Sequence, residues 1–191
     1  MDRRGLDTRD VTRIVAFAAI LAVLGLPGAI PIGGSVPITA QTLGVMLAGA
    51  VLGAWRGAAA VVLFLALVLA GLPLLSGGRG GAGVFVGPSA GYLFGWILGA
   101  FVVGLVVRLG GRRPVWWRTA VGCFLGGALV VYAIGIPVQS MVTGLGLRET
   151  AVTSAAFLPG DLLKTVAATV VTMALWRAYP RAFGNPTRVR A

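Results

Sequence analysis

Long apolar runs separated by short polar gaps divide this chain of 191 residues. A membrane-spanning helix needs about 17 to 25 mostly apolar residues, because the hydrocarbon core of a bilayer is about 30 Å thick. Six runs reach or approach this length, and the second is the shortest. The pattern therefore predicts an all-α integral membrane protein whose six transmembrane helices form one domain over residues 1–191. We expect these helices at residues 14–30, 38–53, 57–75, 91–107, 119–136 and 162–179.

The arginines between these runs predict which side of the membrane each gap faces. Cytoplasmic loops of membrane proteins are enriched in Lys and Arg. If the N-terminus is cytoplasmic, thirteen of the fifteen arginines fall on the cytoplasmic side, and only Arg79 and Arg148 fall outside. The bias predicts that both termini are cytoplasmic and supports an even number of spans.

Composition agrees with a membrane protein. The chain is 58% hydrophobic and 11% charged, with a mean hydropathy of +0.95, whereas about a quarter of the residues in soluble domains are charged. The net charge of +11 does not indicate nucleic-acid binding, because the arginines flank apolar runs instead of forming one patch. The first run continues into further spans and lacks a small-residue cleavage site, so we expect no cleaved signal peptide.

Several kinds of chemistry are excluded by the residues that are missing. The chain has no histidine, one cysteine and five acidic residues, which removes most zinc or iron sites and a Ser-His-Asp triad. Residues 160–165 end in Lys-Thr but lack the glycines of a phosphate-binding loop, and no strand precedes them. We therefore expect no catalytic residues, no metal, no cofactor and no ATP hydrolysis by this chain.

One pair of charges stands out against this background. Lys164 is the only lysine, and Asp161 is the only acidic residue that opens a long apolar run. Residues three apart share a helix face, and a charge inside a bilayer marks a functional site or a paired structural one. Alternatively, Asp161 only interacts with the helix dipole, and Lys164 only extends to the membrane surface.

Other polar residues fall on the same external side in the predicted topology. They lie at the start of the second and fourth runs and in a glycine-rich gap at residues 76–89, which is either a simple turn or a re-entrant loop over a pocket. A few polar groups among apolar walls are typical of a ligand pocket. The candidate binding residues are Asp161, Lys164, Tyr92, Gln41, Arg79, Gly87, Pro88 and Ser89.

Three of these candidates also have a purely structural interpretation. Gln41 can form a helix–helix hydrogen bond, Tyr92 can belong to an interfacial aromatic belt, and Arg79 can be a solvated loop charge. In the first run, Ala18 and Ala22 form a small-xxx-small pattern that lets another helix approach closely. That helix can belong to this chain or to a partner subunit.

Three motifs in a fixed order carry a family resemblance: VPITAQTLGV at residues 36–45, GPSAGY at 87–92 and LPGDLLK at 158–164. With them the chain resembles the BioY family, the biotin-specific S components of energy-coupling factor (ECF) transporters, from the first predicted helix to the end of the sixth. The second motif is often GPTGGY in that family. Ser89 and Ala90 depart from it, and Ala90 leaves slightly less room for a ligand or a neighbouring helix.

The resemblance implies a six-helix S-component fold in a prokaryotic plasma membrane, with biotin captured from the external side. It implies that Asp161 and Lys164 lie at the biotin site and that Ala18 and Ala22 contact a transmembrane T subunit. Separate ATPase A subunits would supply the energy. The partners that it implies are biotin, membrane lipid and these subunits, and no nucleic acid.

Other functions are compatible with the residues alone. The chain can be an S component for a different vitamin, an intramembrane enzyme that uses Asp161 and Lys164 as acid and base, or a structural membrane protein without transport. The sequence leaves open which end of biotin each polar residue contacts.

Overall fold

The computed structural model describes residues 7–26, 28, 36, 39–111 and 113–183, and in these residues every regular element is a helix. The elements are α1 (Thr8–Val23), α2 (Gln41–Leu52), α3 (Ala54–Leu69), η1 (Ala82–Phe85), α4 (Ala90–Arg108), α5 (Trp116–Phe124), the π-helical η2 (Leu125–Val130), α6 (Val131–Thr143), α7 (Leu147–Ser154), η3 (Ala155–Phe157), α8 (Leu158–Ala178) and η4 (Pro180–Phe183). α5, η2 and α6 form one continuous helix, as do α7, η3 and α8. The predicted all-α architecture of six long helical segments is thereby confirmed.

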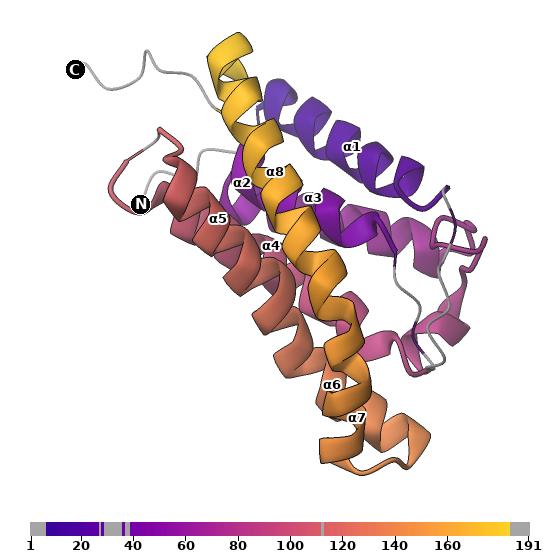
Figure 1. The fold of residues 1–191 in the computed structure, drawn as a ribbon. Coiled ribbons are helices and arrows are strands. Elements are labelled where there is room, and N and C mark those ends of the chain that lie inside the picture. Colours follow the sequence, from indigo (N-terminus) through magenta and orange to yellow (C-terminus); the bar gives the residue numbers. More distant parts are fainter. Residues whose placement is uncertain (1–6, 27, 29–35, 37–38, 112, 184–191) are drawn as a thin grey trace, which may run out of the picture.

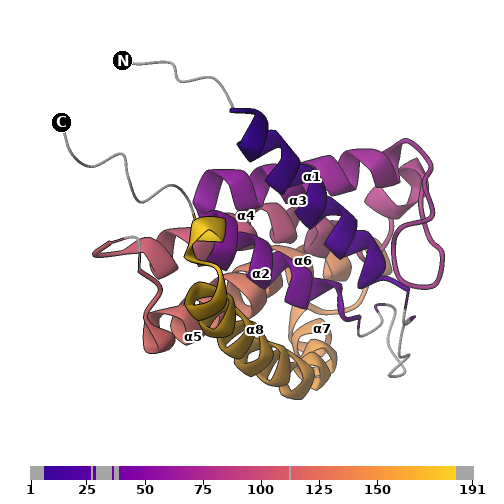
Figure 2. The ribbon, with the colours of Figure 1, turned by 90° about the horizontal axis from the view of Figure 1, so that it is seen from above.

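Helix α4 lies at the centre of the bundle. It packs against α2, α3, α5, η2 and α6, and its side chains at Trp96, Ala100 and Val103 are buried. Around it, α1 packs on α2 and α3, while α8 packs on α2 and α5, so that α2 lies between α1 and α8 (Figure 2). α7 lies at the end of the bundle where α8 begins (Figure 1).

Close packing of α4 on η2 requires two glycines that face each other. A Cβ on Gly99 would lie 2.6 Å from the carbonyl oxygen of Gly126, and a Cβ on Gly126 would lie 2.5 Å from the carbonyl oxygen of Gly99. Either distance is too short for a side chain. Helices in membranes associate through such close backbone contacts, because burial of apolar surface drives little association in lipid.

Three described helices are long and apolar enough to cross a membrane: Ala90–Arg108, Trp116–Thr143 and Leu147–Ala178. Helices α2 and α3 are apolar but shorter. The twelve residues of α2 extend for about 18 Å at about 1.5 Å per residue, well short of the bilayer core of about 30 Å. The first turn of α2 carries the polar residues Gln41 and Thr42.

Some predicted boundaries differ from the structure. The fifth helix continues through Pro137 to Thr143 instead of ending at residue 136. Proline removes one backbone donor, and a membrane helix tolerates this loss when neighbouring helices pack against it. The chain around Glu149 forms α7, which the sequence did not predict. α8 begins at Leu158 instead of 162, with Pro159 in its first turn, where the missing N–H has no intrahelical partner to lose. The first helix spans Thr8–Val23 instead of residues 14–30, because Gly25 and Pro27 disfavour a longer helix. The third ends at Leu69 instead of 75, shortly before Gly71 with its positive φ.

Arginines that were predicted to be cytoplasmic gather at one end of the bundle. Arg108 donates hydrogen bonds to the carbonyl oxygens of Val51 (2.7 Å) and Phe183 (3.2 Å). Arg56 forms an ion pair with Asp10 at 2.8 Å. These contacts join the ends of α1, α2, α3, α4 and η4. The cytoplasmic location of this end stays a prediction.

Candidate functional site

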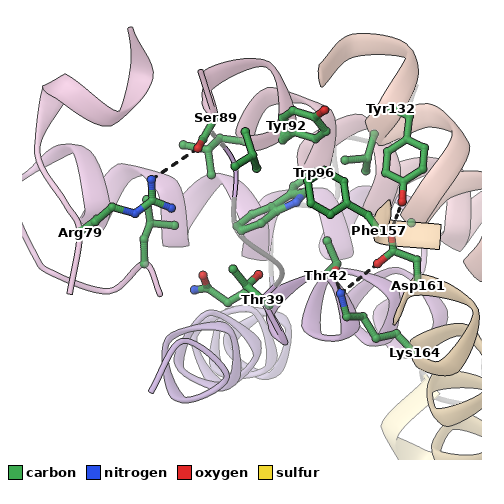
Figure 3. A pocket seen from close by; sticks show the side chains of 16 residues that line it. Thr39, Thr42, Arg79, Ser89, Tyr92, Trp96, Tyr132, Phe157, Asp161 and Lys164 are labelled. Carbon is green, nitrogen blue, oxygen red and sulfur yellow. Dashed lines mark hydrogen bonds and ion pairs between the residues drawn. The ribbon is translucent and has the colours of Figure 1, made fainter. Parts of the chain in front are cut away.

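A pocket lies at the other end of the bundle, where α2, α4, α6 and α8 approach one another (Figure 3). Its empty volume is about 590 Å³, a figure that includes space open to solvent. The lining residues are Val36, Thr39, Gln41, Thr42, Leu75, Arg79, Ser89, Tyr92, Leu93, Trp96, Gly127, Val131, Tyr132, Phe157, Asp161 and Lys164.

Asp161 and Lys164 form a direct ion pair in this pocket. Asp161 stands in the first turn of α8 and is only 3% exposed. Its Oδ1 lies 2.9 Å from Nζ of Lys164, one helical turn further on. The phenol of Tyr132, on α6, donates a hydrogen bond to Oδ2 of the same carboxylate. The prediction that the two charges share a helix face is confirmed by this contact.

Lys164 extends the hydrogen-bonded chain to a third helix, because its Nζ donates to Oγ1 of Thr42 on α2 at 2.8 Å. Tyr132, Asp161, Lys164 and Thr42 thus form a continuous chain of polar groups across α6, α8 and α2 (Figure 3). A buried ion pair is tolerated only when further hydrogen bonds satisfy its atoms. Both carboxylate oxygens have such partners, so this end of the pocket is electrically neutral and held in place before any ligand arrives.

Arg79 and Ser89 lie at a separate part of the pocket (Figure 3). Nη1 of Arg79 donates to Oγ of Ser89 at 3.4 Å, and Nε donates to the carbonyl oxygen of Ser76 at 3.3 Å. Within the part of the chain that the structure describes, no carboxylate forms an ion pair with Arg79. The guanidinium therefore leaves this part of the pocket positively charged.

Aromatic rings line the space between these polar groups. Trp96 comes from α4, Tyr132 from α6, and Phe157 from η3 (Figure 3). The ring of Phe157 lies 6.2 Å from that of Tyr92 in an edge-to-face arrangement and 6.4 Å from that of Tyr132. Such packed rings form a rigid apolar wall, and they favour a ligand whose middle part is apolar.

Gln41 lines the pocket, yet its amide is used to hold the protein together. Its Nε2 donates to the carbonyl oxygens of Leu21 (3.1 Å) and Leu74 (3.0 Å), and its Oε1 accepts from the backbone N–H of Ser76 (3.1 Å). The residue is 1% exposed. Its amide therefore joins the end of α1 to the segment that carries Arg79, which agrees with the structural interpretation of this residue.

Tyr92 also differs from the sequence-based expectation of a ligand-binding hydroxyl. Its ring lines the pocket, but its phenol donates to Oε1 of Gln139 at 2.7 Å and lies 3.0 Å from Oγ of Ser154. These buried partners tie α4 to α6 and α7. Tyr92 thus contributes its ring to the pocket wall, while its hydroxyl forms hydrogen bonds behind that wall.

Six of the eight predicted binding residues line the pocket, and Gly87 and Pro88 do not. The carbonyl of Gly87 accepts from the backbone N–H of Ala90 at 3.0 Å, so the turn at 87–90 sets the start of α4 and the position of Ser89. In α1, Ala18 faces the core at 3% exposure, whereas Ala22 is partly exposed. Of this pair, only Ala22 is accessible to a partner helix.

Sequence reasoning missed Tyr132, Trp96 and Phe157 as pocket residues. A signal existed for Tyr132, which is one of three tyrosines and sits in the middle of an apolar run, where a hydroxyl needs a partner. No comparable signal distinguished Trp96 or Phe157 from other apolar residues. Among the described residues, no group of three or more His, Cys, Asp or Glu side chains is placed to hold a metal ion.

Comparison with known proteins gives consistent matches over most of the chain. The BioY family model matches residues 1–181. A protein of Rhodobacter capsulatus named biotin transporter BioY is 50% identical over 183 residues, which cover 91% of this chain and 96% of that protein. A protein of the same name from Rhizobium etli is 49% identical over 181 residues, 92% of this chain and 97% of that protein.

A solved structure shares the fold. It is described as the crystal structure at 2.1 Å of the S-component for biotin from an ECF-type ABC transporter. It matches this chain with a TM-score of 0.84 and 34% sequence identity, over 88% of this chain and 91% of that chain. The similarity confirms the expected S-component fold.

Proposed function

The chain belongs to the BioY family, and on this premise we propose that it is the biotin-binding S component of a vitamin uptake system in a prokaryotic plasma membrane. The observation that carries the proposal is the pocket. The ion pair of Asp161 and Lys164 has no net charge, Arg79 is a cation at a separate part of the pocket, and aromatic rings line the space between them. Relatives from Rhodobacter capsulatus and Rhizobium etli are named as biotin transporters.

The chemistry of biotin suits this arrangement. Its ureido group has two N–H donors and one carbonyl acceptor, its sulfur-containing ring and aliphatic chain are apolar, and its carboxylate is an anion. Asp161 can accept hydrogen bonds from N–H groups, and Lys164 has a third ammonium hydrogen beyond the two used for Asp161 and Thr42. The apolar middle of the ligand would lie against Trp96 and Phe157.

We propose that the ureido group lies at Asp161 and that the carboxylate lies at Arg79. A carboxylate placed beside Asp161 would meet a like charge whose neutralising partner, Lys164, is already engaged. Arg79 has no such acidic partner in the described residues, and a guanidinium can bind a carboxylate through two parallel hydrogen bonds. Charge balance therefore favours this orientation over the reverse.

We propose that transport is energised by separate subunits. The chain has no GxxxxGK[ST] motif, which would bind the phosphates of ATP. A T subunit and ATPase subunits would supply this function, with α1 as the contact helix. The exposed residues Val15 (51%), Ile20 (38%) and Val23 (60%) accompany Ala22 on the accessible side of α1. Ala22→Trp would then reduce ATP-dependent uptake in cells but leave biotin binding by the purified protein intact.

The proposal is tested by titration calorimetry of the protein in lipid nanodiscs, with biotin and with biotin methyl ester. We expect one biotin per chain, and tighter binding of the acid than of the ester. Arg79→Gln should weaken biotin about tenfold or more, since hydrogen bonds to charged groups contribute about 1.5 to 3 kcal/mol, and should change ester binding little. Arg148→Gln, at an exposed arginine on α7, is the matched control.

Two results would contradict different parts of the proposal. Absence of biotin binding by the unmodified protein, together with a different vitamin identified by mass spectrometry of co-purified material, would assign another substrate. Equal loss of acid and ester binding in Arg79→Gln would reject the proposed orientation while leaving biotin as the ligand.

A further inference from the structure

Thr42 is at the end of the hydrogen-bonded chain that begins at Tyr132, and its hydroxyl differs from those of Thr165 and Thr169 in α8. The hydroxyls of Thr165 and Thr169 donate to the carbonyl oxygens four residues earlier, at 2.8 and 2.7 Å. Such bonds use the only hydroxyl hydrogen. Thr42 is the second residue of α2, so the helix has no residue four positions earlier whose carbonyl could accept from it.

The hydroxyl oxygen of Thr42 accepts a hydrogen bond from Nζ of Lys164 at 2.8 Å. A hydroxyl has one hydrogen to donate in addition to its two lone pairs. Within the residues that the structure describes, the oxygen accepts this one bond and its hydrogen has no protein acceptor. Because the oxygen accepts from an ammonium group, the O–H is polarised and becomes a better donor.

This donor faces the ligand space. Thr42 lines the pocket together with Asp161 and Lys164, and Figure 3 shows its side chain beside the lysine ammonium group. A hydroxyl in such a place, without a protein acceptor, needs one from a ligand or water. The carboxylate of Asp161 accepts hydrogen bonds, and Thr42 and Lys164 beside it donate them. These three side chains therefore favour a ligand in which a carbonyl acceptor lies next to N–H donors.

We propose that Thr42 is a specificity-determining residue that donates a hydrogen bond to the carbonyl oxygen of a bound ureido group. The inference rests on the proposed function, because it assumes that this end of the pocket receives the ureido ring of biotin. It assigns a separate role to each of the hydrogen-bonded side chains. Asp161 accepts from the ligand N–H groups, Tyr132 and Lys164 hold the carboxylate of Asp161 in place, and Thr42 donates to the carbonyl oxygen of the ligand. A ligand whose carbonyl is replaced by a weaker acceptor would lose the contribution of Thr42.

The test compares biotin with 2-thiobiotin, in which sulfur, a weaker acceptor, replaces the ureido oxygen. Unmodified protein, Thr42→Val and Thr42→Ser are titrated in nanodiscs with both ligands and with biotin methyl ester. We expect Thr42→Val, which keeps the shape but loses the hydroxyl, to bind biotin about tenfold more weakly. Its preference for biotin over 2-thiobiotin should fall by a similar factor, and its preference for biotin over the ester should stay unchanged. Thr42→Ser should bind biotin within about threefold of the unmodified protein.

Thr169→Val is the control, because this threonine donates to its own helix and does not line the pocket. It should bind both ligands as the unmodified protein does, and thermal unfolding of each variant checks its fold. Equal weakening of biotin and 2-thiobiotin by Thr42→Val would show that the residue only positions Lys164, and would overturn the inference, as would unchanged affinity. Lack of biotin binding by the unmodified protein would instead reject the proposed function and this inference with it.

Discussion

The phenol of Tyr132 on α6 donates a hydrogen bond to Oδ2 of Asp161 on α8, while the other oxygen of the same carboxylate binds Lys164. The acid is thus held from two helices at once. Its orientation is set by the protein and not by the ligand, so a ligand donor meets a carboxylate that is already in place. This reduces the entropy lost on binding.

The first prediction concerns Tyr132→Phe, which removes the phenolic oxygen and keeps the ring. We expect biotin affinity to fall about tenfold or more, since a hydrogen bond to a charged group contributes about 1.5 to 3 kcal/mol. Titration calorimetry in nanodiscs measures this. Tyr179→Phe, at a tyrosine that is 56% exposed beyond the end of α8, should leave affinity unchanged. Equal affinities of both variants would show that Tyr132 does not fix the acid.

Tyr92→Phe should behave in the opposite way. The phenol of Tyr92 interacts with Gln139 and Ser154 behind the pocket wall, and only the ring lines the pocket. We expect the free energy of unfolding to fall by about 1 to 3 kcal/mol, because the buried Oε1 of Gln139 loses its 2.7 Å hydrogen bond and keeps only the one from Ser154 at 3.5 Å. Biotin affinity should change by less than about threefold. Thermal unfolding and calorimetry on the same preparation separate the two effects. A large loss of biotin affinity without a loss of stability would instead mean that the hydroxyl of Tyr92 binds the ligand.

Changes at Asp161 and Lys164 should be coupled. Asp161→Asn or Lys164→Met alone leaves one charge of the pair without its partner. The cost is about 3 to 5 kcal/mol when the buried Asp161 is left, and less when the partly exposed Lys164 is left. The double variant has no unpaired charge and should be more stable than either single variant, although all three should bind biotin poorly. Thermal unfolding gives the coupling free energy through a double-mutant cycle. Additive losses of stability would mean that the 2.9 Å contact contributes little.

Gln41→Leu tests the role of the amide that joins two segments. The change leaves the carbonyls of Leu21 and Leu74 and the N–H of Ser76 without their present partner. We expect a loss of at least about 3 kcal/mol in the free energy of unfolding, since each unsatisfied buried group costs about 1 to 3 kcal/mol. Thr12→Val, at an exposed hydroxyl, should change stability by less than about 0.5 kcal/mol. Similar stabilities for both variants would contradict the structural role.

The position of the charge pair could be predicted because it depends on local geometry. Residues three apart on one helix meet whatever the rest of the chain does, so LPGDLLK was enough to place Asp161 beside Lys164. The six apolar segments could likewise be predicted, since a hydropathy pattern separates apolar runs from the polar gaps between them. Helix ends were less accurate, as at α7 and Pro137, because packing partners decide whether a short polar segment or a proline can stay helical.

The partners of the pair were beyond sequence reasoning. Thr42 and Tyr132 reach the charges from α2 and α6, and which atoms meet depends on how deeply a short α2 is set against α8. The same holds for Gln41 and Tyr92, whose polar atoms face the protein instead of the ligand space. Hydropathy and helical periodicity suffice to predict an all-helical membrane chain with one charged pair at the start of its last helix. Which polar groups remain available to a ligand depends on the folded arrangement, because hydrogen bonds between distant segments occupy the others.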